Sequence, residues 1–116
     1  MRNGVKKRQF GRTNKQRDAL IRSLARSLVV NNAIITTEAK AKSLRKFVDK
    51  LVTEGKKSTL TSRRFLLSYI GADGTAQMLN QIVPKMASRS GGYTRIFHLP
   101  PRLSDGARMA KITFSD

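Results

Sequence analysis

Cysteine and tryptophan are absent from this chain of 116 residues, and histidine occurs once. Without cysteine there is no disulfide framework, no thiolate metal site and no cysteine nucleophile. Zinc sites need several His or Cys ligands, so the single His98 argues against a metalloenzyme. No stretch approaches the roughly 18 apolar residues of a membrane-spanning helix, and the N-terminus lacks the apolar core of a signal peptide. We therefore expect a soluble, intracellular protein.

Acidic residues are scarce. Asp and Glu total 7 against 24 Lys and Arg, which gives a formal charge of +17. Such a charge on one small domain is strongly self-repulsive unless a polyanion neutralises it. Nucleic acid is the first candidate partner and an anionic membrane surface is the second. Because 39% of the residues are hydrophobic, we expect a folded domain rather than a disordered polycation.

The chain length fits one domain. Residues 1–12 are basic and contain no acid, so we expect an arm that is disordered in the free protein and ordered on a polyanion. The bases of this arm are Arg2, Lys6, Lys7, Arg8 and Arg12. Residues 13–116 are then expected to form a single folded domain.

Hydrophobic spacing and turn residues predict an α+β fold. The predicted helices cover residues 13–30, 38–54, 61–70 and 74–83. The predicted strands cover residues 33–37, 93–99 and 107–115. We expect a two-layer domain, in the order helix, strand, three helices and two strands, with the helices packed on one face of a three-stranded sheet.

Residues with strong local preferences mark the ends of these helices. Thr13 is predicted to cap the first helix and Asp73 the last one. A Thr cap is also expected between the first strand and the second helix. Gly71 is predicted to stop the third helix, and Pro84 the last one.

Two predicted helices carry bases on the side opposite their apolar face. On the first helix these are Lys15, Arg22 and Arg26, and on the second Lys42, Arg45, Lys46 and Lys50. Ordinary protein surfaces mix charges of both signs, so two basic faces indicate binding rather than simple solvation. The candidate set for binding a polyanion further includes Lys40 on the second helix and Arg63 and Arg64 at the start of the third.

Residues 88–95 form the best local candidate for a binding loop. Arg89 and Arg95 can grip phosphates, and Gly91 and Gly92 allow a backbone to approach closely. The hydroxyl of Thr94 can bond a phosphate or a ribose. Tyr93 has two interpretations that spacing alone leaves open: it stacks on a base, or it lies in the core where the loop enters a strand.

Catalysis has little support in the sequence. The acids fall at predicted helix ends, on exposed helix faces, in a turn or at the terminus, and no pair is set up as acid and base. His98 near a strand end is expected to be structural. The segment from Gly71 to Gly74 lacks the spacing and the lysine of a phosphate-binding loop. Aromatic residues are only 6% of the chain, so Lys and Arg recognition of a folded RNA surface is favoured over aromatic stacking.

Two blocks of sequence carry a resemblance to a known family. Residues 34–42 read IITTEAKAK and residues 49–56 read DKLVTEGK. Together they closely resemble a signature of the ribosomal protein seventeen family of the bacterial large subunit. Residues 88–96, SRSGGYTRI, resemble that family's second signature. The arm differs, because it begins RNGVKK where a denser run of Arg, His and Lys is expected.

The resemblance implies an α+β domain with a three-stranded sheet and a structural role in the large subunit, where the protein binds the large ribosomal RNA. It implies a place on the solvent side near the exit of the peptide tunnel, with neighbouring ribosomal proteins as further partners. It implies no enzymatic activity and no cofactor, and we expect no metal, small-molecule substrate, membrane contact or homo-oligomer. The compact chain resembles bacterial members, and so a cytoplasmic location in the ribosome is expected.

Three other classes of protein fit the sequence less well. A DNA-compacting protein would need an apolar wedge or an extended dimer seam, which the sequence does not indicate. A membrane-surface protein would need a spare amphipathic helix, but the apolar faces here suffice for the domain's own core. A small enzyme would need an acid–base pair. Structured RNA remains the expected partner.

Overall fold

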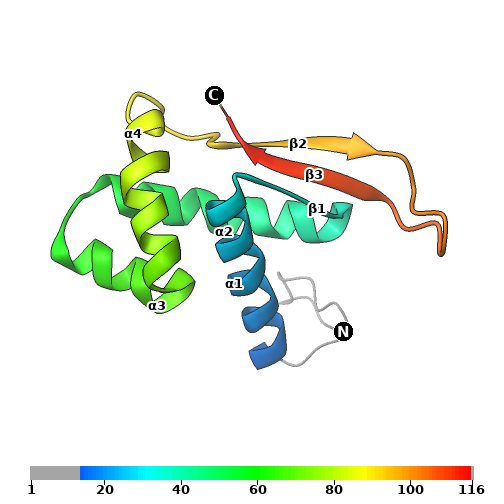
Figure 1. The fold of residues 1–116 in the computed structure, drawn as a ribbon, viewed down its shortest axis with the longest axis horizontal. Coiled ribbons are helices and arrows are strands. Elements are labelled where there is room, and N and C mark those ends of the chain that lie inside the picture. The colour runs from blue at the N-terminus through cyan, green and yellow to red at the C-terminus, as the bar shows by residue number, and fades with distance from the viewer. Residues whose placement is uncertain (1–13, 116) are drawn as a thin grey trace, which may run out of the picture.

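The computed structural model describes residues 14–115, so the expected arm and the Thr13 cap lie outside the described residues. The first helix, α1, spans Asn14–Asn31 and is followed by strand β1, Ala33–Thr37. Helix α2 spans Glu38–Lys56, and α3 spans Leu60–Gln77. A π-helical turn, η1 (Met78–Ile82), leads into the short helix α4 (Val83–Met86). Strands β2 (Thr94–Leu99) and β3 (Met109–Phe114) complete the fold (Figure 1).

The three strands form one antiparallel sheet in the order β1-β3-β2. The last strand of the chain is therefore the central one. The register sets Ile34 and Ile96 opposite Ile112, and these three residues share the face that packs on the helices. Ala110 and Ile112 are buried, as the alternation in the last strand predicts. The predicted α+β class with a three-stranded sheet is confirmed.

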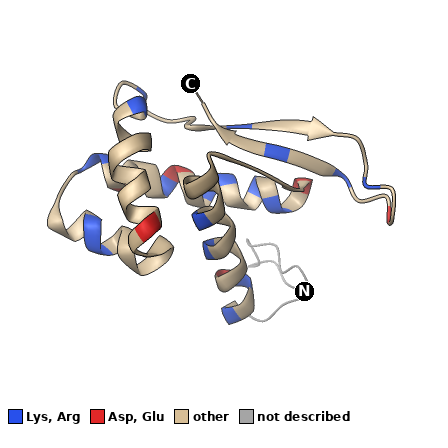
Figure 2. Cartoon of the chain, viewed as in Figure 1, with Lys and Arg blue, Asp and Glu red and all other residues tan. Residues whose placement is uncertain are grey.

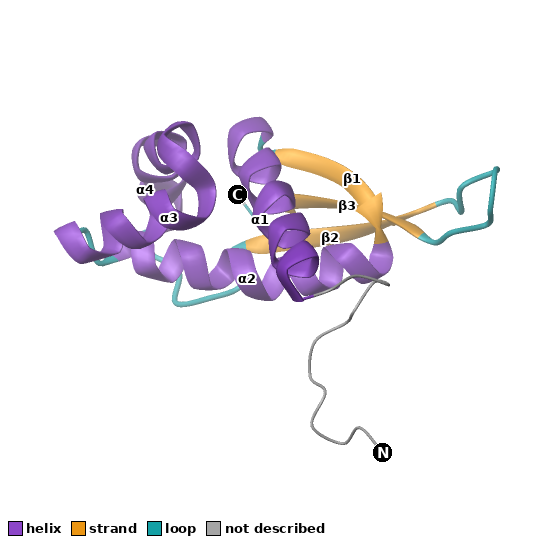
Figure 3. Ribbon diagram, turned by 90° about the horizontal axis from the view of Figure 1, so that it is seen from below, coloured by secondary structure: helices purple, strands orange, loops and turns teal. Residues whose placement is uncertain are grey.

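Helix α2 runs along the length of the molecule, with the sheet over one part of it and α3 and α4 over the other (Figure 3). It packs on all three strands, whereas α1 reaches the sheet at β1. Apart from one another, α3 contacts α1 and α2, while η1 and α4 contact α2. The expectation that all the helices lie on the sheet is therefore corrected. The apolar side chains of α3 are used against the other helices, which gives the core a helical half and a sheet half.

Local residue preferences account for most element boundaries. Thr37 caps α2 and accepts a hydrogen bond from the Lys40 N–H at 3.4 Å, which confirms the expected Thr cap. Thr59 and Ser62 form a reciprocal capping box at the start of α3. Gly71 has φ 74° and ψ 179°, so the predicted stop is present as a sharp kink within α3. Asp73, predicted as a cap, instead makes an ion pair with Arg26.

The prediction that Pro84 ends its helix is wrong. Pro84 lies in the first turn of α4, directly after the π-helical turn. In a π turn the carbonyls bond the N–H five residues later, as Val83 N–H does with Met78 O. Pro84 follows this turn at the start of α4, and proline is tolerated in the first turn of a helix because its missing N–H is not needed there. The chain continues helically to Met86 for this reason.

Candidate nucleic-acid interface

Helix α2 holds the loop between α4 and β2 in place. The carbonyl of Arg89 accepts hydrogen bonds from Lys56 Nζ and from the Tyr93 hydroxyl, the latter at 3.3 Å. Lys56 Nζ also lies 3.3 Å from the Tyr93 oxygen and 5.3 Å from the centre of its ring. One lysine of α2 thus fixes both ends of the loop, and so it sets where Arg89 and the start of β2 lie.

Tyr93 and Thr94 belong to the core, and this corrects their place in the candidate set. Each is only 2% exposed. A ring in this position has no free face on which a base can stack, and the Thr94 hydroxyl is equally out of reach. Of the two interpretations of Tyr93, the structure supports the one in which it anchors the loop. Its hydroxyl finds its partner in the Arg89 carbonyl, as buried tyrosines commonly require.

The two glycines of the loop leave open space on its outer side. Gly92 has φ +63°, a conformation that side chains with a Cβ rarely adopt. A Cβ placed on Gly91 or Gly92 would meet no heavy atom within 4 Å. The close approach expected for these glycines is therefore not made within the protein. The loop backbone remains accessible to a partner.

The C-terminal end of β3 and α2 hold the other side of this loop. Ser115 donates its N–H to Tyr93 O at 2.8 Å and its hydroxyl to Gly92 O at 3.2 Å. Asp49 of α2 lies beside the start of β2, where burial raises the pKa of its carboxyl and the Arg45 guanidinium and the Tyr93 N–H partly oppose that shift. The loop is consequently held in place by neighbouring elements of the fold and is not a loose connection.

The basic side chains of α1 turn toward α3. The guanidinium of Arg22 lies over the ring of Tyr69, 4.6 Å from its centre. Arg26 lies 3.4 Å from Asp73, with over half of its side chain still exposed. Lys15 is exposed near the start of α1. The expected exposure of these three residues is present, while two of them also tie α1 to α3.

The remaining predicted bases lie on several elements. On α2, Lys42, Arg45 and Lys46 are exposed while Lys40 is partly buried. Arg63 and Arg64 are exposed in the first turn of α3. Arg89 is partly buried in the loop and Arg95 is exposed on β2. The five bases predicted in the arm lie outside the described residues.

Nearby cations occupy much of the scarce negative charge. Lys42 pairs with Glu38 at 3.0 Å, Lys57 with Glu54 at 3.0 Å, and Arg102 with Asp105 at 2.8 Å. The hydrogen bond from Lys42 is the main reason that the pKa of Glu38 lies below its ordinary value. His98 approaches the same carboxylate at 3.4 Å. These exposed pairs contribute little stability, but they leave an excess of unpaired cations on the surface.

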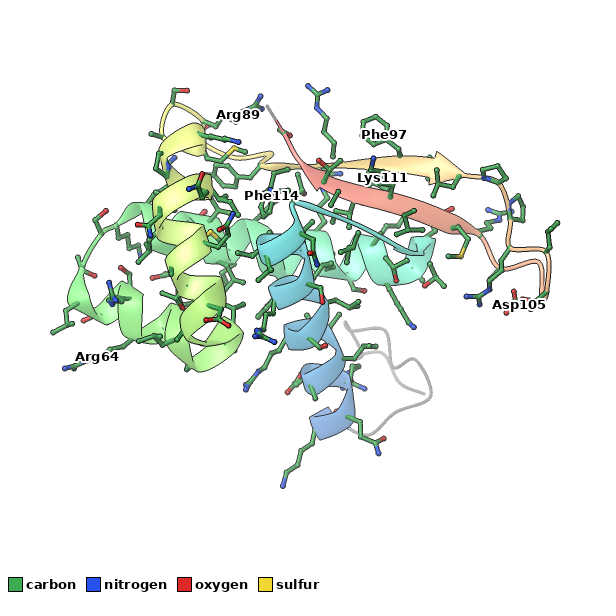
Figure 4. All side chains as sticks on the ribbon, in the orientation of Figure 1. Arg64, Arg89, Phe97, Asp105, Lys111 and Phe114 are labelled. Atoms are coloured by element: carbon green, nitrogen blue, oxygen red, sulfur yellow. The ribbon has the colours of Figure 1, made fainter. Side chains whose placement is uncertain are left out.

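The excess positive charge is spread over the molecule (Figure 2). Lys and Arg colour α1, α2, α3, the loop and the strands, with only a few acids between them. Arg64 at one end of the molecule and Arg89 near the loop lie far from the β2–β3 connection, which Asp105 marks (Figure 4). The structure does not gather the predicted residues into one patch. It presents them on more than one side.

Lys56 is not among the candidate residues, and the predicted second helix ends before it, at residue 54. The structure places it in the last turn of α2, where it holds the loop. The signal that was present is its position at the end of the block DKLVTEGK, which also contains Asp49. Both residues support the loop from α2, so that block and the SRSGGYTRI block meet in space.

Two features are absent from residues 14–115. No three His, Asp or Glu residues of this part come together in a way that would hold a metal ion. Among its helices, none is long and apolar enough to cross a bilayer.

Comparison with known proteins gives one consistent family. Residues 20–115 match the family model described as ribosomal protein L17. The large ribosomal subunit protein bL17 of Gemmatimonas aurantiaca is 48% identical, over 97% of this chain and 96% of that protein. The bL17 protein of a Hydrogenobaculum species is 46% identical over 98% of both chains. That of Shouchella clausii is 44% identical over 91% of this chain and 96% of its own. The chain therefore belongs to the ribosomal protein L17 family.

Proposed function

We propose that this chain binds large-subunit ribosomal RNA on several sides at once and neutralises phosphates where RNA segments pack together. As a member of the ribosomal protein L17 family, the chain is a structural component of the large ribosomal subunit and not an enzyme. Its place is therefore the cytoplasmic ribosome. The proposal concerns the surfaces with which it binds there, and its neighbours are large-subunit RNA and other ribosomal proteins.

The distribution of charge carries this proposal. Exposed bases lie on both main helices, on α3 and on the sheet, whereas much of the acidic charge is engaged by nearby cations. A protein that meets a duplex or a membrane with one face would gain nothing from bases on its other sides. A protein that folded RNA contacts on several sides would use bases on each of those sides. The helix bases we assign to RNA phosphates are Lys15, Arg22, Arg26, Lys40, Lys42, Arg45, Lys46, Arg63 and Arg64.

The loop supplies a different kind of contact. Open space over Gly91 and Gly92 admits an RNA backbone to within van der Waals distance of the loop backbone. Arg89 and Arg95 flank that opening, and their planar guanidinium groups can bond phosphates in a bidentate manner. Tyr93 and Thr94 support this loop from the core. We further propose that residues 1–12 form an RNA-binding arm and that residues 13–116 form a single rRNA-binding domain.

Replacing Arg45 and Lys46 together by Gln tests the helix contribution. Each phosphate contact that is lost should lower the salt dependence of the logarithm of affinity by about 0.7–0.9. The double variant should therefore bind purified large-subunit rRNA more weakly, with a salt slope lower by up to about 1.4–1.8. Filter binding across a series of salt concentrations measures both quantities.

Lys57→Gln is the matched control. Lys57 lies next to the end of α2 and pairs with Glu54, and it is outside the proposed interface. Its loss should leave the salt slope almost unchanged. An unchanged slope in the Arg45/Lys46 variant would remove α2 from the interface. Equal affinity of the wild-type chain for duplex DNA at the same salt concentration would instead favour a general polyanion binder.

A further inference from the structure

The side of the sheet that faces away from α2 is open. Ile35, Lys111 and Phe97 lie side by side in one row across the three strands, since Lys111 pairs in register with both of the others. Ile35 is 65% exposed and Phe97 49% exposed. Single exposed apolar residues are normal on protein surfaces. Two in one row, on either side of a lysine, form an exposed apolar patch, and such patches indicate a binding surface.

Phe97 stands out among the Phe and Tyr residues between positions 14 and 115. The others in this part are buried or partly buried, whereas Phe97 is exposed. Its ring projects from β2 on the side away from the helices (Figure 4). The ring is rigid and held by a strand, so a planar partner can lie on it with little loss of side-chain freedom.

The charges around Phe97 favour an anionic partner. Lys111 is directly opposite it, and Arg95 lies two residues before it on the same face of β2. Both are exposed, and none of the three strands contains an Asp or a Glu. A flat ring flanked by two cations matches a nucleotide, whose base has an apolar face and whose phosphate is negative.

The size of the face argues against a protein partner. Three strands of five to six residues span about 17–20 Å in length and about 10–15 Å in width. A stable protein interface buries roughly 800 Å² on each partner, which is several times the area of this face. A few unpaired nucleotides fit it.

From these observations we propose that Phe97 stacks on an unpaired base of the large-subunit rRNA, with Arg95 and Lys111 holding the neighbouring phosphates. The inference rests on the proposed function, and it names a second, aromatic mode of contact on the sheet. It adds to the phosphate contacts of the helices and loop and does not replace them.

Variants of Phe97 separate stacking from simple hydrophobic contact. Phe97→Ala and Phe97→Leu remove the aromatic face, and Leu retains most of the apolar surface. Phe97→Trp keeps an aromatic face. Loss of one base–aromatic stack should weaken binding to purified large-subunit rRNA by about 5- to 150-fold in the Ala and Leu variants. The Trp variant should bind like the wild type, and no variant should change the salt slope because no charge is altered.

Leu60→Ala is the control, since Leu60 is a 63% exposed apolar residue at the start of α3, away from the sheet. It should bind like the wild type. If Phe97→Ala and Phe97→Leu also bind like the wild type, the stacking site is wrong. Should those two variants then be missing from assembled subunits, the sheet would be a docking face for a protein instead. If the wild-type chain does not bind the rRNA at all, both this inference and the proposed function fail.

Discussion

At the scale of single residues, the loop between α4 and β2 depends on the backbone freedom of Gly92. Its positive φ lets the chain turn from the helical half of the core into the sheet, and Ser115 then fixes the Gly92 carbonyl. Gly91 beside it has no such conformation and equal open space. The pair therefore separates the cost of backbone strain from the effect of an added methyl group.

Gly92→Ala should lower the free energy of unfolding by about 1–2 kcal/mol, which is the cost of a left-handed conformation for a residue with a Cβ. Gly91→Ala should stay within about 0.5 kcal/mol of the wild type. Urea unfolding monitored by circular dichroism measures both values. Equal destabilisation by the two variants would show that the conformation of Gly92 is not what matters.

Asp105 in the β2–β3 connection gives a pH-dependent test. Hydrogen bonds from Arg102, and then from the Ala107 N–H, lower the pKa of its carboxyl to about 2. Since the folded-state pKa lies below the ordinary value, the ionised carboxylate stabilises the connection at neutral pH. That contribution should be lost as the pH falls from about 4 to about 2.

NMR titration of the Asp105 carboxyl carbon should give a midpoint near 2. Arg102→Ala should move the midpoint up toward 3.8, the ordinary value, though not fully, because the Ala107 N–H remains. Arg108→Ala, which removes a nearby base that does not bond Asp105, should leave it in place. A midpoint that ignores the loss of Arg102 would contradict the ion pair.

The role of a single residue can be predicted from sequence where it depends only on the residues next to it in the chain. Thr37 is an example, because a Thr between a strand and a helix caps the helix. Tyr93 is the opposite case. Strand alternation would place it on the same face as Arg95 and Phe97, but β2 begins only at Thr94. In the core it contacts Lys56, which is 37 residues away in the sequence, as well as the nearby Arg89 carbonyl.

At the scale of elements, α3 depends on its first turn. The sequence pattern predicts this helix from residue 61, but in the structure it begins at Leu60 with Thr59 as the cap. The hydroxyl of Thr59 accepts from the Ser62 N–H at 3.1 Å, and the Ser62 hydroxyl accepts from the Thr59 N–H at 3.0 Å. The pattern was missed because the third helical residue is Ser rather than the Glu or Gln of the usual capping box.

Thr59→Ala should therefore destabilise the protein by about 1 kcal/mol, since it leaves an N–H of the first turn without its partner. Thr61→Ala is the control, because Thr61 is exposed inside the same turn and does not act as the cap. Thermal unfolding by calorimetry compares the two. A Thr59 variant as stable as the Thr61 variant would contradict the capping role.

Element boundaries away from caps were less predictable. The strands were placed to within about two residues, because apolar alternation is a local property. The continuation of the helix through Pro84 was not predicted, because it follows a π-helical turn. Met78 and Ile82 of that turn are both buried, so core packing holds the turn in a form that sequence periodicity does not report.

At the scale of the whole molecule, the sequence indicated an α+β domain with bases on its helices, but not which layer each helix joins. The spacing of apolar residues in α3 is the same whether the helix packs on a sheet or on other helices. Their place on α1 and α2 extends the molecule to 42 × 32 × 24 Å. The extension spreads the basic residues over a longer surface, which suits a protein that contacts RNA on more than one side.

We propose that RNA contacts on several sides hold this chain in the large subunit. The decisive experiment is sedimentation of a cell lysate on sucrose gradients, at low and then high salt, with the chain followed by mass spectrometry. We expect one copy per large subunit, retained at high salt, because many contacts must break together for release. Protein at the top of the gradient, or bound only at low salt, would overturn the proposal.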